Sequence, residues 1–361
     1  MLQRQADAAA LSEAAYRWFA DVDREVAVIA AQMATNGKID RARVREAVLR
    51  LKRKMTDVHA LNTAVRLARG RVPPGSEEAW RLQTLHRRLD TERGTLLRWP
   101  WIERRVMEIV SAKRRPLYRK PLSFDDILRE QIIGGDALLS VLHSALNRRK
   151  QDAVGAEIDA FPDIAMHNSL FQSHMHAAYR VWLAQGRSTK GRFIDVGCGG
   201  GMKIVSAQYY FDHCDGLELD PGYCKEARKL VKAARLPNTE IFQTNAVTWD
   251  GYDQYDVIYF YRPIRDNALL ADMERRIVEL ARPGALLIGP YTGFEQRWEA
   301  LDCTHVTGAI YLAKTSKAAA RRLLRAAEKT GPSVAHRMPM ARSRWDPILQ
   351  QARDRGWSIA M

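Results

Sequence analysis

The chain has 361 residues, of which 27% are charged and 46% are hydrophobic, and its formal net charge is +15. This length exceeds that of an ordinary single domain, so we expect two units, and the composition excludes a disordered, collagenous or disulfide-dense protein. The four cysteines form no CxxC pair and show no histidine spacing suited to zinc, so no metal site is expected. No apolar run reaches the ~18 residues of a membrane span, and no secretory signal is visible at the N-terminus. We therefore expect a cytoplasmic protein without membrane contact.

The positive charge lies at the two ends of the sequence. Residues 1–150 carry 30 Lys and Arg against 18 Asp and Glu, and residues 314–361 carry 11 against 3, whereas residues 191–313 carry 13 against 17. Such asymmetry is typical of contact with an anionic partner, here RNA or an acidic protein. The alternative interpretation is a set of solvated helix faces that are rich in arginine.

Residues 1–150 are predicted to form a basic, all-helical N-terminal domain. Two apolar stripes at helical spacing flank the turn Asn36-Gly37-Lys38, and Asp40 is suited to cap the second helix. Residues 8–69 therefore predict an antiparallel helical hairpin. The domain is a candidate homodimer interface or lid.

More helices are expected along the rest of this domain. Ser76, followed by two glutamates, is predicted to begin one helix. Others are expected around residues 101–112, 123–132 and 136–149, with Ser123 and Asp136 as candidate caps.

From about residue 164 the pattern changes to short apolar strands that alternate with helices. A lead-in helix, capped by Asp163, is expected to end near Ala184. The predicted strands are Arg192–Val196, Asp215–Leu219, Thr239–Phe242, Asp256–Phe260 and Ala285–Gly289. This alternation favours an α/β, doubly wound parallel sheet over residues 151–313. Residues 314–361 are expected to form a basic helical extension, with Thr315-Ser316 as a helix cap.

The most informative segment is Asp195-Val196-Gly197-Cys198-Gly199-Gly200-Gly201, which follows a buried strand and precedes a helix. Glycines at such a turn permit unusual backbone angles and let a ligand approach the main chain closely. Met202 stands where a dinucleotide GxGxxG fingerprint needs glycine. Glu218, at the end of the next strand, is placed to accept hydrogen bonds from two ribose hydroxyls.

These residues resemble the first motif of the class I S-adenosylmethionine-dependent methyltransferases. The resemblance extends over roughly residues 164–313, through Gly216-Leu217-Glu218-Leu219-Asp220-Pro221, the strand Asp256–Phe260 and the segment 280–286. It implies a Rossmann-like, seven-stranded-type methyltransferase domain that binds S-adenosyl-L-methionine. It also implies an enzyme.

The resemblance assigns cofactor roles to matched positions. Asp195 is implied near the methionine amino group, beside the turn that contains Gly197, Cys198, Gly199 and Gly201. Glu218 and Leu219 are implied at the ribose. Asn245 and Ala246 are implied at the adenine, although asparagine replaces the acidic residue that the family usually has there; its amide oxygen still accepts hydrogen bonds.

The methyl acceptor is not fixed by the sequence. Tyr259, Tyr261 and Arg262 follow the fourth strand, at the expected mouth of the site, and are the candidate catalytic residues. Arg262 and Arg265 are suited to clamp a phosphate or carboxylate, the tyrosines to contact an aromatic or amine acceptor, and His305 is a distant candidate base.

Three functional interpretations remain open. The leading one is direct methyl transfer to a macromolecular acceptor, RNA or protein. The first alternative is a small-molecule methyltransferase with the helical domain as lid or dimer interface. The second is a catalytically silent, cofactor-binding scaffold for nucleic acid or protein.

Overall fold

The computed structural model describes residues 8–34, 39–111, 113–118, 122–123, 126–146, 161, 166–187, 191–331, 343–355 and 357. The chain divides into two compact units. One contains Met1–Lys113 and Ala335–Met361, and the other contains Arg114–Val334. The boundary expected at residue 150 therefore lies near residue 114, and the C-terminal extension is split between the two units.

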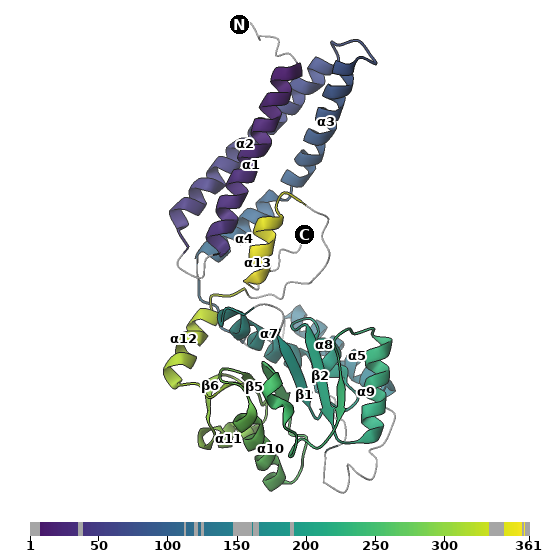
Figure 1. Cartoon of the computed structure of the whole chain (residues 1–361), viewed down its shortest axis with the longest axis vertical. Helices are drawn as coiled ribbons and strands as arrows, with labels where there is room; N and C mark the ends of the chain where they lie inside the picture. Colours follow the sequence, from purple (N-terminus) through teal and green to yellow (C-terminus); the bar gives the residue numbers. More distant parts are fainter. Residues whose placement is uncertain are drawn as a thin grey trace. The chain divides into compact units, whose positions relative to one another are not determined.

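The described part of the first unit is a bundle of five helices (Figure 1): α1 (Ala8–Ala34), α2 (Arg41–Arg69), α3 (Glu77–Leu96), α4 (Trp99–Ser111) and α13 (Asp346–Asp354). α1 packs along α2, as the expected helical hairpin requires. Asp40 and Ser76 cap their helices as expected, since their side chains accept the backbone N–H groups of Arg43 and Ala79. The expected turn Asn36-Gly37-Lys38 lies outside the described residues.

The apolar stripes of these helices form the core of the first unit, and one polar position joins two of them. Asn62 interrupts the stripe of α2 and is buried. Its amide donates to Asp90 on α3 at 2.8 Å, and its oxygen lies 2.7 Å from Nδ1 of His86. A buried amide with both ends bonded fixes the pairing of the two helices.

The last helix, α13, completes this core, which corrects the expectation of a separate tail. Trp345, at its start, is fully buried and packs against Trp99 with 5.0 Å between ring centroids. Its indole N–H donates to the carbonyl of Thr95 at 2.9 Å. Arg344 forms an ion pair with Glu92 at 2.8 Å. The arginines of this segment are therefore partly structural.

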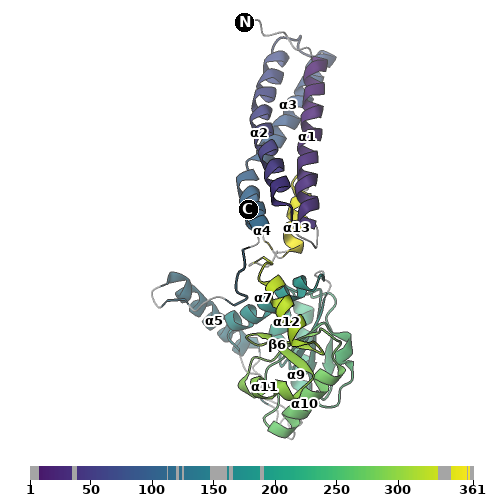
Figure 2. The same cartoon turned by 90° about the vertical axis from the view of Figure 1, so that its left-hand side faces the viewer.

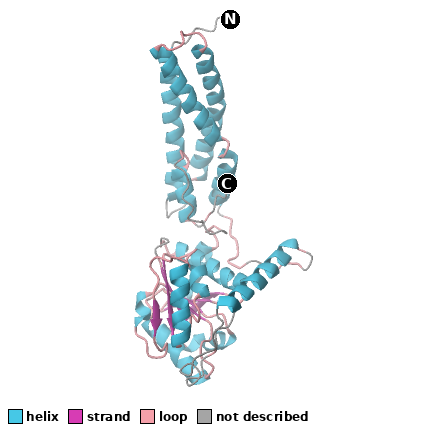
Figure 3. Ribbon diagram, turned by 90° about the vertical axis from the view of Figure 1, so that its right-hand side faces the viewer, coloured by secondary structure: helices cyan, strands magenta, loops and turns pink. Residues whose placement is uncertain are grey.

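The second unit is a seven-stranded sheet with helices on both faces (Figure 3). The strands are β1 (Arg192–Val196), β2 (His213–Glu218), β3 (Ile241–Gln243), β4 (Val257–Phe260), β5 (Leu286–Ile288), β6 (Cys303–Thr307) and β7 (Ile310–Ala313). Their order is β3-β2-β1-β4-β5-β7-β6, and β7 runs antiparallel to the other six strands. The predicted doubly wound α/β fold is confirmed, with two strands that were not predicted, β7 and the edge strand β6.

Alternating strand residues pack on opposite helix layers. Phe193 and Tyr259 belong to the core that includes α7 (Asn168–Ala184), α8 (Met202–Ala207), α9 (Pro221–Ala233) and α12 (Lys317–Ala327). Ile194 and Phe260 belong to the opposite core, formed with α10 (Asn267–Leu280) and α11 (Thr292–Arg297). Two short 3-10 turns, Gly251–Gln254 and Trp298–Ala300, complete this layer. α12 is thus part of the sheet domain, and Ser316 caps it as predicted.

Before the sheet, the structure has one helix where two were expected. α5 runs from Ile127 to Leu146. Neither predicted cap is used: Asp126 accepts the N–H of Leu128, and Asp136 lies inside the helix and binds Ser169. The predicted start of the lead-in helix at Ile164 and its cap Asp163 lie outside the described residues; α7 begins at Asn168.

Candidate functional site

The glycine turn after β1 has the unusual backbone that the sequence predicts. Gly197, Gly199 and Gly201 have φ of +78°, +52° and +84°, a region that favours glycine. The N–H groups of Gly197 and Cys198 donate to the carbonyl of Leu217 at 2.8 and 3.0 Å. The turn is thereby fixed to the end of the neighbouring strand.

Gly197 is required for a second reason. A Cβ atom at this position would lie 2.4 Å from Cβ of Pro263, which follows β4. The backbone of the turn and the segment after β4 therefore approach each other more closely than any side chain at residue 197 allows.

A cleft of about 740 Å³ opens beside this turn, at the carboxyl ends of the parallel strands. That size lies within the range of small-molecule and cofactor sites. Of the residues predicted from sequence, nine line the cleft: Asp195, Gly197, Gly199, Glu218, Leu219, Asn245, Ala246, Tyr261 and Arg262. The structure thus brings together residues that are up to 67 positions apart in the sequence.

Glu218 lies at the end of β2 with both carboxylate oxygens oriented by the backbone. One oxygen accepts the N–H of Gly199 at 2.9 Å, and the other accepts those of Leu219 and Asp220 at 2.8 and 2.9 Å. A carboxylate oxygen keeps further lone pairs after such bonds. Glu218 therefore connects the glycine turn to β2 and remains able to accept hydrogen bonds from a ligand.

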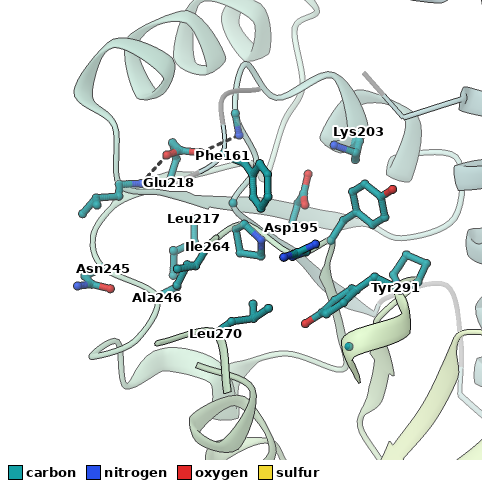
Figure 4. A pocket seen from close by; sticks show the side chains of 18 of the residues that line it. Phe161, Asp195, Lys203, Leu217, Glu218, Asn245, Ala246, Ile264, Leu270 and Tyr291 are labelled. Carbon is teal, nitrogen blue, oxygen red and sulfur yellow. Dashed lines mark hydrogen bonds between the residues drawn. The ribbon is translucent and has the colours of Figure 1, made fainter. Parts of the chain in front are cut away.

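Asp195 lies near the middle of the cleft, between Glu218 and Tyr291 in the view of Figure 4. It is the fourth residue of β1 and is 1% exposed, yet it contributes to the cleft lining. A buried carboxylate at the floor of an open cleft favours a cationic ligand group.

Asn245 and Ala246 lie beyond Glu218, on the same side of the cleft (Figure 4). The side-chain oxygen of Asn245 accepts the N–H of Val247 at 2.9 Å, which closes a local turn. This contact uses one lone pair of the oxygen that was expected to serve the ligand, and the second lone pair remains.

Three predicted residues do not line the cleft. Gly201 shapes the turn from behind, because a Cβ there would lie 3.2 Å from Ala227. The Cys198 side chain is buried and lies beside Gly216 and Ile204 instead. Tyr259 is fully buried in the α7 layer, where its hydroxyl lies 3.1 Å from the sulfur of Met166.

Tyr259 is therefore a correction to the predicted catalytic set. Strand alternation directs its ring into the helix layer, away from the mouth. Burial raises the pKa of its hydroxyl well above the ordinary value, so it stays protonated at neutral pH. His305 is exposed on β6, does not line the cleft, and its Nε2 lies 2.9 Å from the carbonyl of Gly308.

The mouth of the cleft contains a residue that sequence reasoning missed. Phe161 lines the cleft and donates its N–H to the carbonyl of Pro263 at 3.1 Å. The guanidinium groups of Arg262 and Arg265 lie 5.3 and 5.0 Å from its ring centroid, within cation–π range. Arg262 itself has a φ of +42°, which is unusual for a residue with a side chain.

The opposite wall depends on a buried glutamate that was also missed. Glu274 on α10 is fully buried and accepts the Tyr291 hydroxyl at 2.5 Å and two N–H groups of Arg297 at 2.6 and 2.7 Å. Both partners line the cleft. The sequence contained a signal, since Tyr291 follows the fifth strand, where open α/β sheets place ligand contacts.

No protein-family model matches the sequence, and no curated protein matches it either. Among solved structures, the chain is similar to an RNA methyltransferase from Salinibacter ruber in complex with S-adenosyl-L-homocysteine, with 19% identity over 35% of this chain and 76% of that chain and a TM-score of 0.29. It is also similar to CalS10, an amino pentose methyltransferase from Micromonospora echinaspora, with 23% identity over 33% of this chain and half of that chain and a TM-score of 0.29. A third similar structure is the N-methyltransferase NodS from Bradyrhizobium japonicum, with 14% identity over 43% of this chain and 76% of that chain and a TM-score of 0.31.

The seven-stranded sheet and the glycine turn after its first strand match what the sequence resemblance implied. The second unit has the Rossmann-like, seven-stranded fold that this resemblance implies. In the described part of the chain, no three His, Cys, Asp or Glu side chains gather in a way that would hold a metal ion. None of the described helices combines the length and the apolar character needed to cross a bilayer.

Proposed function

We propose that this chain binds S-adenosyl-L-methionine in the cleft of the second unit and transfers the cofactor's methyl group to an acceptor at the cleft mouth. The observation that carries this proposal is the convergence of the glycine turn, Asp195 and Glu218 on one cleft. The residues fit the cofactor chemically. Gly197 and Gly199 leave room against the main chain, and two carboxylates face a molecule with an amino group and two ribose hydroxyls.

The cleft has two chemically different ends. Glu218, Asn245 and Ala246 lie on one side, where they would hold the adenosine, and Asp195 lies between them and Tyr291 (Figure 4). When bound, the cofactor supplies a methyl group that is already activated on a sulfonium. The protein therefore needs chiefly to orient the acceptor and exclude water. Tyr261 and Arg262, at the mouth, are the side chains in position to orient it.

The acceptor that we propose is an anionic macromolecule, and RNA is the one that the charge distribution supports best. The first unit contains 27 Lys and Arg against 16 Asp and Glu, or +11 of the net +15. On α2, Arg45, Arg53, Arg66 and Arg69 are exposed. Polyanion binding by such side chains is strongly salt-dependent, because counterions are released.

Calorimetry with S-adenosylmethionine tests the cofactor assignment. We expect binding by the wild type and a large loss for Asp195→Asn, with Asp212→Asn, away from the cleft, as the matched control. Absence of binding by the folded wild-type chain would refute the proposal. Binding without methyl transfer to any cellular fraction would instead favour the silent scaffold.

Transfer of tritiated methyl groups into fractionated lysate tests the acceptor. We expect counts in macromolecular material that nuclease releases and protease does not. Reversal of the four α2 arginines to glutamate should lower this transfer and leave cofactor binding unchanged. Counts confined to the small-molecule fraction would support the metabolite alternative and contradict an RNA acceptor.

A further inference from the structure

Helix α5 exposes far more apolar surface than a solvated helix normally does. None of its described residues is buried. Eight large apolar side chains on this single helix are between 39% and 72% exposed: Ile127, Leu128, Ile132, Ile133, Leu138, Val141, Leu142 and Leu146. The largest apolar patch of a typical monomer is roughly 300–600 Å² and often marks an interaction site. The helix extends away from the sheet (Figure 2), so this surface is accessible.

One face of α5, in its second half, is attached to the rest of its unit. Asp136 accepts the backbone N–H and the hydroxyl of Ser169 at 2.8 and 2.5 Å. Leu139, Ser140 and His143 line a small cavity together with residues of α7 and α8. The residues before Asp136 lack comparable packing, because all but Arg129 are exposed.

The outward face of α5 is a stripe without charged residues. Its members follow one another at alternating steps of four and three residues: Ile127, Gln131, Gly134, Leu138, Val141 and Ala145. Such steps place side chains on one face of a helix. The stripe therefore has the form of a helix-packing seam.

This seam is complementary to itself. If two copies run antiparallel about Asp136, Ile127 meets Ala145, Gln131 meets Val141, and Gly134 meets Leu138. A Cβ at Gly134 would have nothing within 4 Å, so the position is an open notch, whereas Leu138 is 69% exposed and projects. Large-to-small matching across a two-fold axis is what an isologous interface needs.

We propose that α5 is a dimerisation arm that pairs antiparallel with α5 of a second copy of this chain, with Leu138 of each copy in the Gly134 notch of the other. The absence of charge on the seam means that no like charges meet across the axis. A membrane surface is a poorer match for this helix, because interfacial helices carry several basic residues on their polar face and α5 carries Arg129 beside Glu130.

Sedimentation equilibrium of the full chain over roughly 1–100 µM tests the arm. We expect a dimer for the wild type, and a dissociation constant at least about tenfold higher for Leu138→Gln, in the range of an interface hot spot. Leu97→Gln is the matched control, because Leu97 is 76% exposed in the other unit. A wild type that stays monomeric throughout would overturn the proposal. Co-sedimentation of a monomer with anionic phospholipid vesicles would also overturn it, since the apolar face of α5 would then bind lipid.

The variant Gly134→Leu distinguishes specific pairing of two α5 helices from non-specific hydrophobic association. It adds apolar surface and improves helix propensity, so non-specific association would strengthen. Pairing through the notch predicts the opposite, a weaker dimer in a chain that is at least as stable. Stronger association of this variant would contradict the proposal.

Disulfide trapping tests the register. The four native cysteines are buried, so oxidation reports chiefly on introduced thiols. Chains with Gly134→Cys mixed with chains with Leu138→Cys should form a covalent dimer faster than either variant alone. Equal or faster trapping within a single variant would exclude the antiparallel register about Asp136.

Discussion

The carboxylate of Glu218 accepts the backbone N–H of Gly199 at 2.9 Å, so the residue that ends β2 also holds the glycine turn that follows β1. Glu218 thereby has two tasks, one toward the turn and one toward the ligand. The glycine turn is therefore already ordered before a ligand binds to Glu218. Preorganisation of this kind lowers the entropic cost of binding.

Glu218→Gln is expected to weaken S-adenosylmethionine binding by about 10- to 100-fold, which corresponds to roughly 1.4–2.8 kcal/mol. The amide has one acceptor oxygen in place of two, so it loses either the Gly199 contact or those of Leu219 and Asp220. Calorimetry measures the change. Glu240→Gln, an exposed glutamate just before β3, should bind normally; equal affinities for both variants would contradict the assignment.

Gly197→Ala should destabilise the second unit and abolish cofactor binding. The backbone at residue 197 has a positive φ that is unfavourable for alanine, and the added Cβ would lie 2.4 Å from Cβ of Pro263. The expected loss in the free energy of unfolding is roughly 2–4 kcal/mol. Gly186→Ala is a matched control, since Gly186 has a φ of +74° with nothing within 4 Å of its Cβ. It should show the backbone penalty alone, about 1 kcal/mol, with binding retained. Denaturant titration measures the stability of the two variants, and calorimetry measures their cofactor binding. Equal losses in both variants would contradict a specific clash between residue 197 and Pro263.

His174 is expected to make the second unit sensitive to acid. Burial lowers the pKa of its imidazole to about 4, and its Nδ1 lies 3.0 Å from the Tyr118 hydroxyl. The unfolded chain binds a proton at this site below pH ~6.5 while the folded chain does not. Stability should therefore fall as the pH drops from about 6.5 to 4, by on the order of 3 kcal/mol from this group.

The comparison of His174→Gln with the wild type isolates this effect. Urea titrations at pH 7 and pH 4.5 should show a smaller loss of stability for the variant, because glutamine does not titrate. The same acid sensitivity in both proteins would mean that other groups are responsible.

Arg180 is expected to be one of the most sensitive positions of the sheet domain. It is 1% exposed on α7 and donates to the carbonyls of Pro116, Arg115 and Ala327 at 2.8–3.2 Å. Burial lowers its pKa to about 10, so it stays charged at neutral pH. Arg180→Met leaves these buried acceptors without donors and should cost roughly 2–4 kcal/mol in denaturant unfolding. Arg322→Met, on the exposed face of α12, should change stability by less than about 0.5 kcal/mol.

Much of the cleft around the glycine turn could be predicted from the sequence, because local constraints specify it. The glycines of the turn have positive φ for steric reasons that hold in any context, and Glu218 ends the strand beside it. The helix caps at Asp40, Ser76 and Ser316 were likewise visible, because capping depends on residues a few positions apart.

The mouth of the cleft could not be predicted to the same extent. Tyr259 and Tyr261 lie two positions apart and would share one face of a continuing strand, so alternation alone does not separate them. The sequence does not show that β4 ends at Phe260, which leaves Tyr259 buried and places Tyr261 beyond the strand, in the cleft lining. Phe161 reaches the cleft through a backbone contact with a residue about a hundred positions away, which leaves no local signal. The edge strand β6 includes threonine and histidine, which weakened its apolar pattern, and β7 is a run of only four apolar residues.

The two helices expected around residues 123–132 and 136–149 form one helix in the structure, which continues through Gly134-Gly135. Adjacent glycines are otherwise a common helix break. A glycine pair that persists inside a helix points to packing against a small space, which is consistent with the proposed notch.

The contact between Trp99 and Trp345 has a consequence for synthesis on the ribosome. The bundle takes core residues from Trp345 and α13, so residues 1–113 cannot bury Trp99 against Trp345 until this later segment has been made. The sheet domain is made entirely in between. We therefore expect the sheet domain to reach its native state first, while the core of the bundle is still incomplete. Emergence of α13 from the ribosome would then be the event that completes the bundle core.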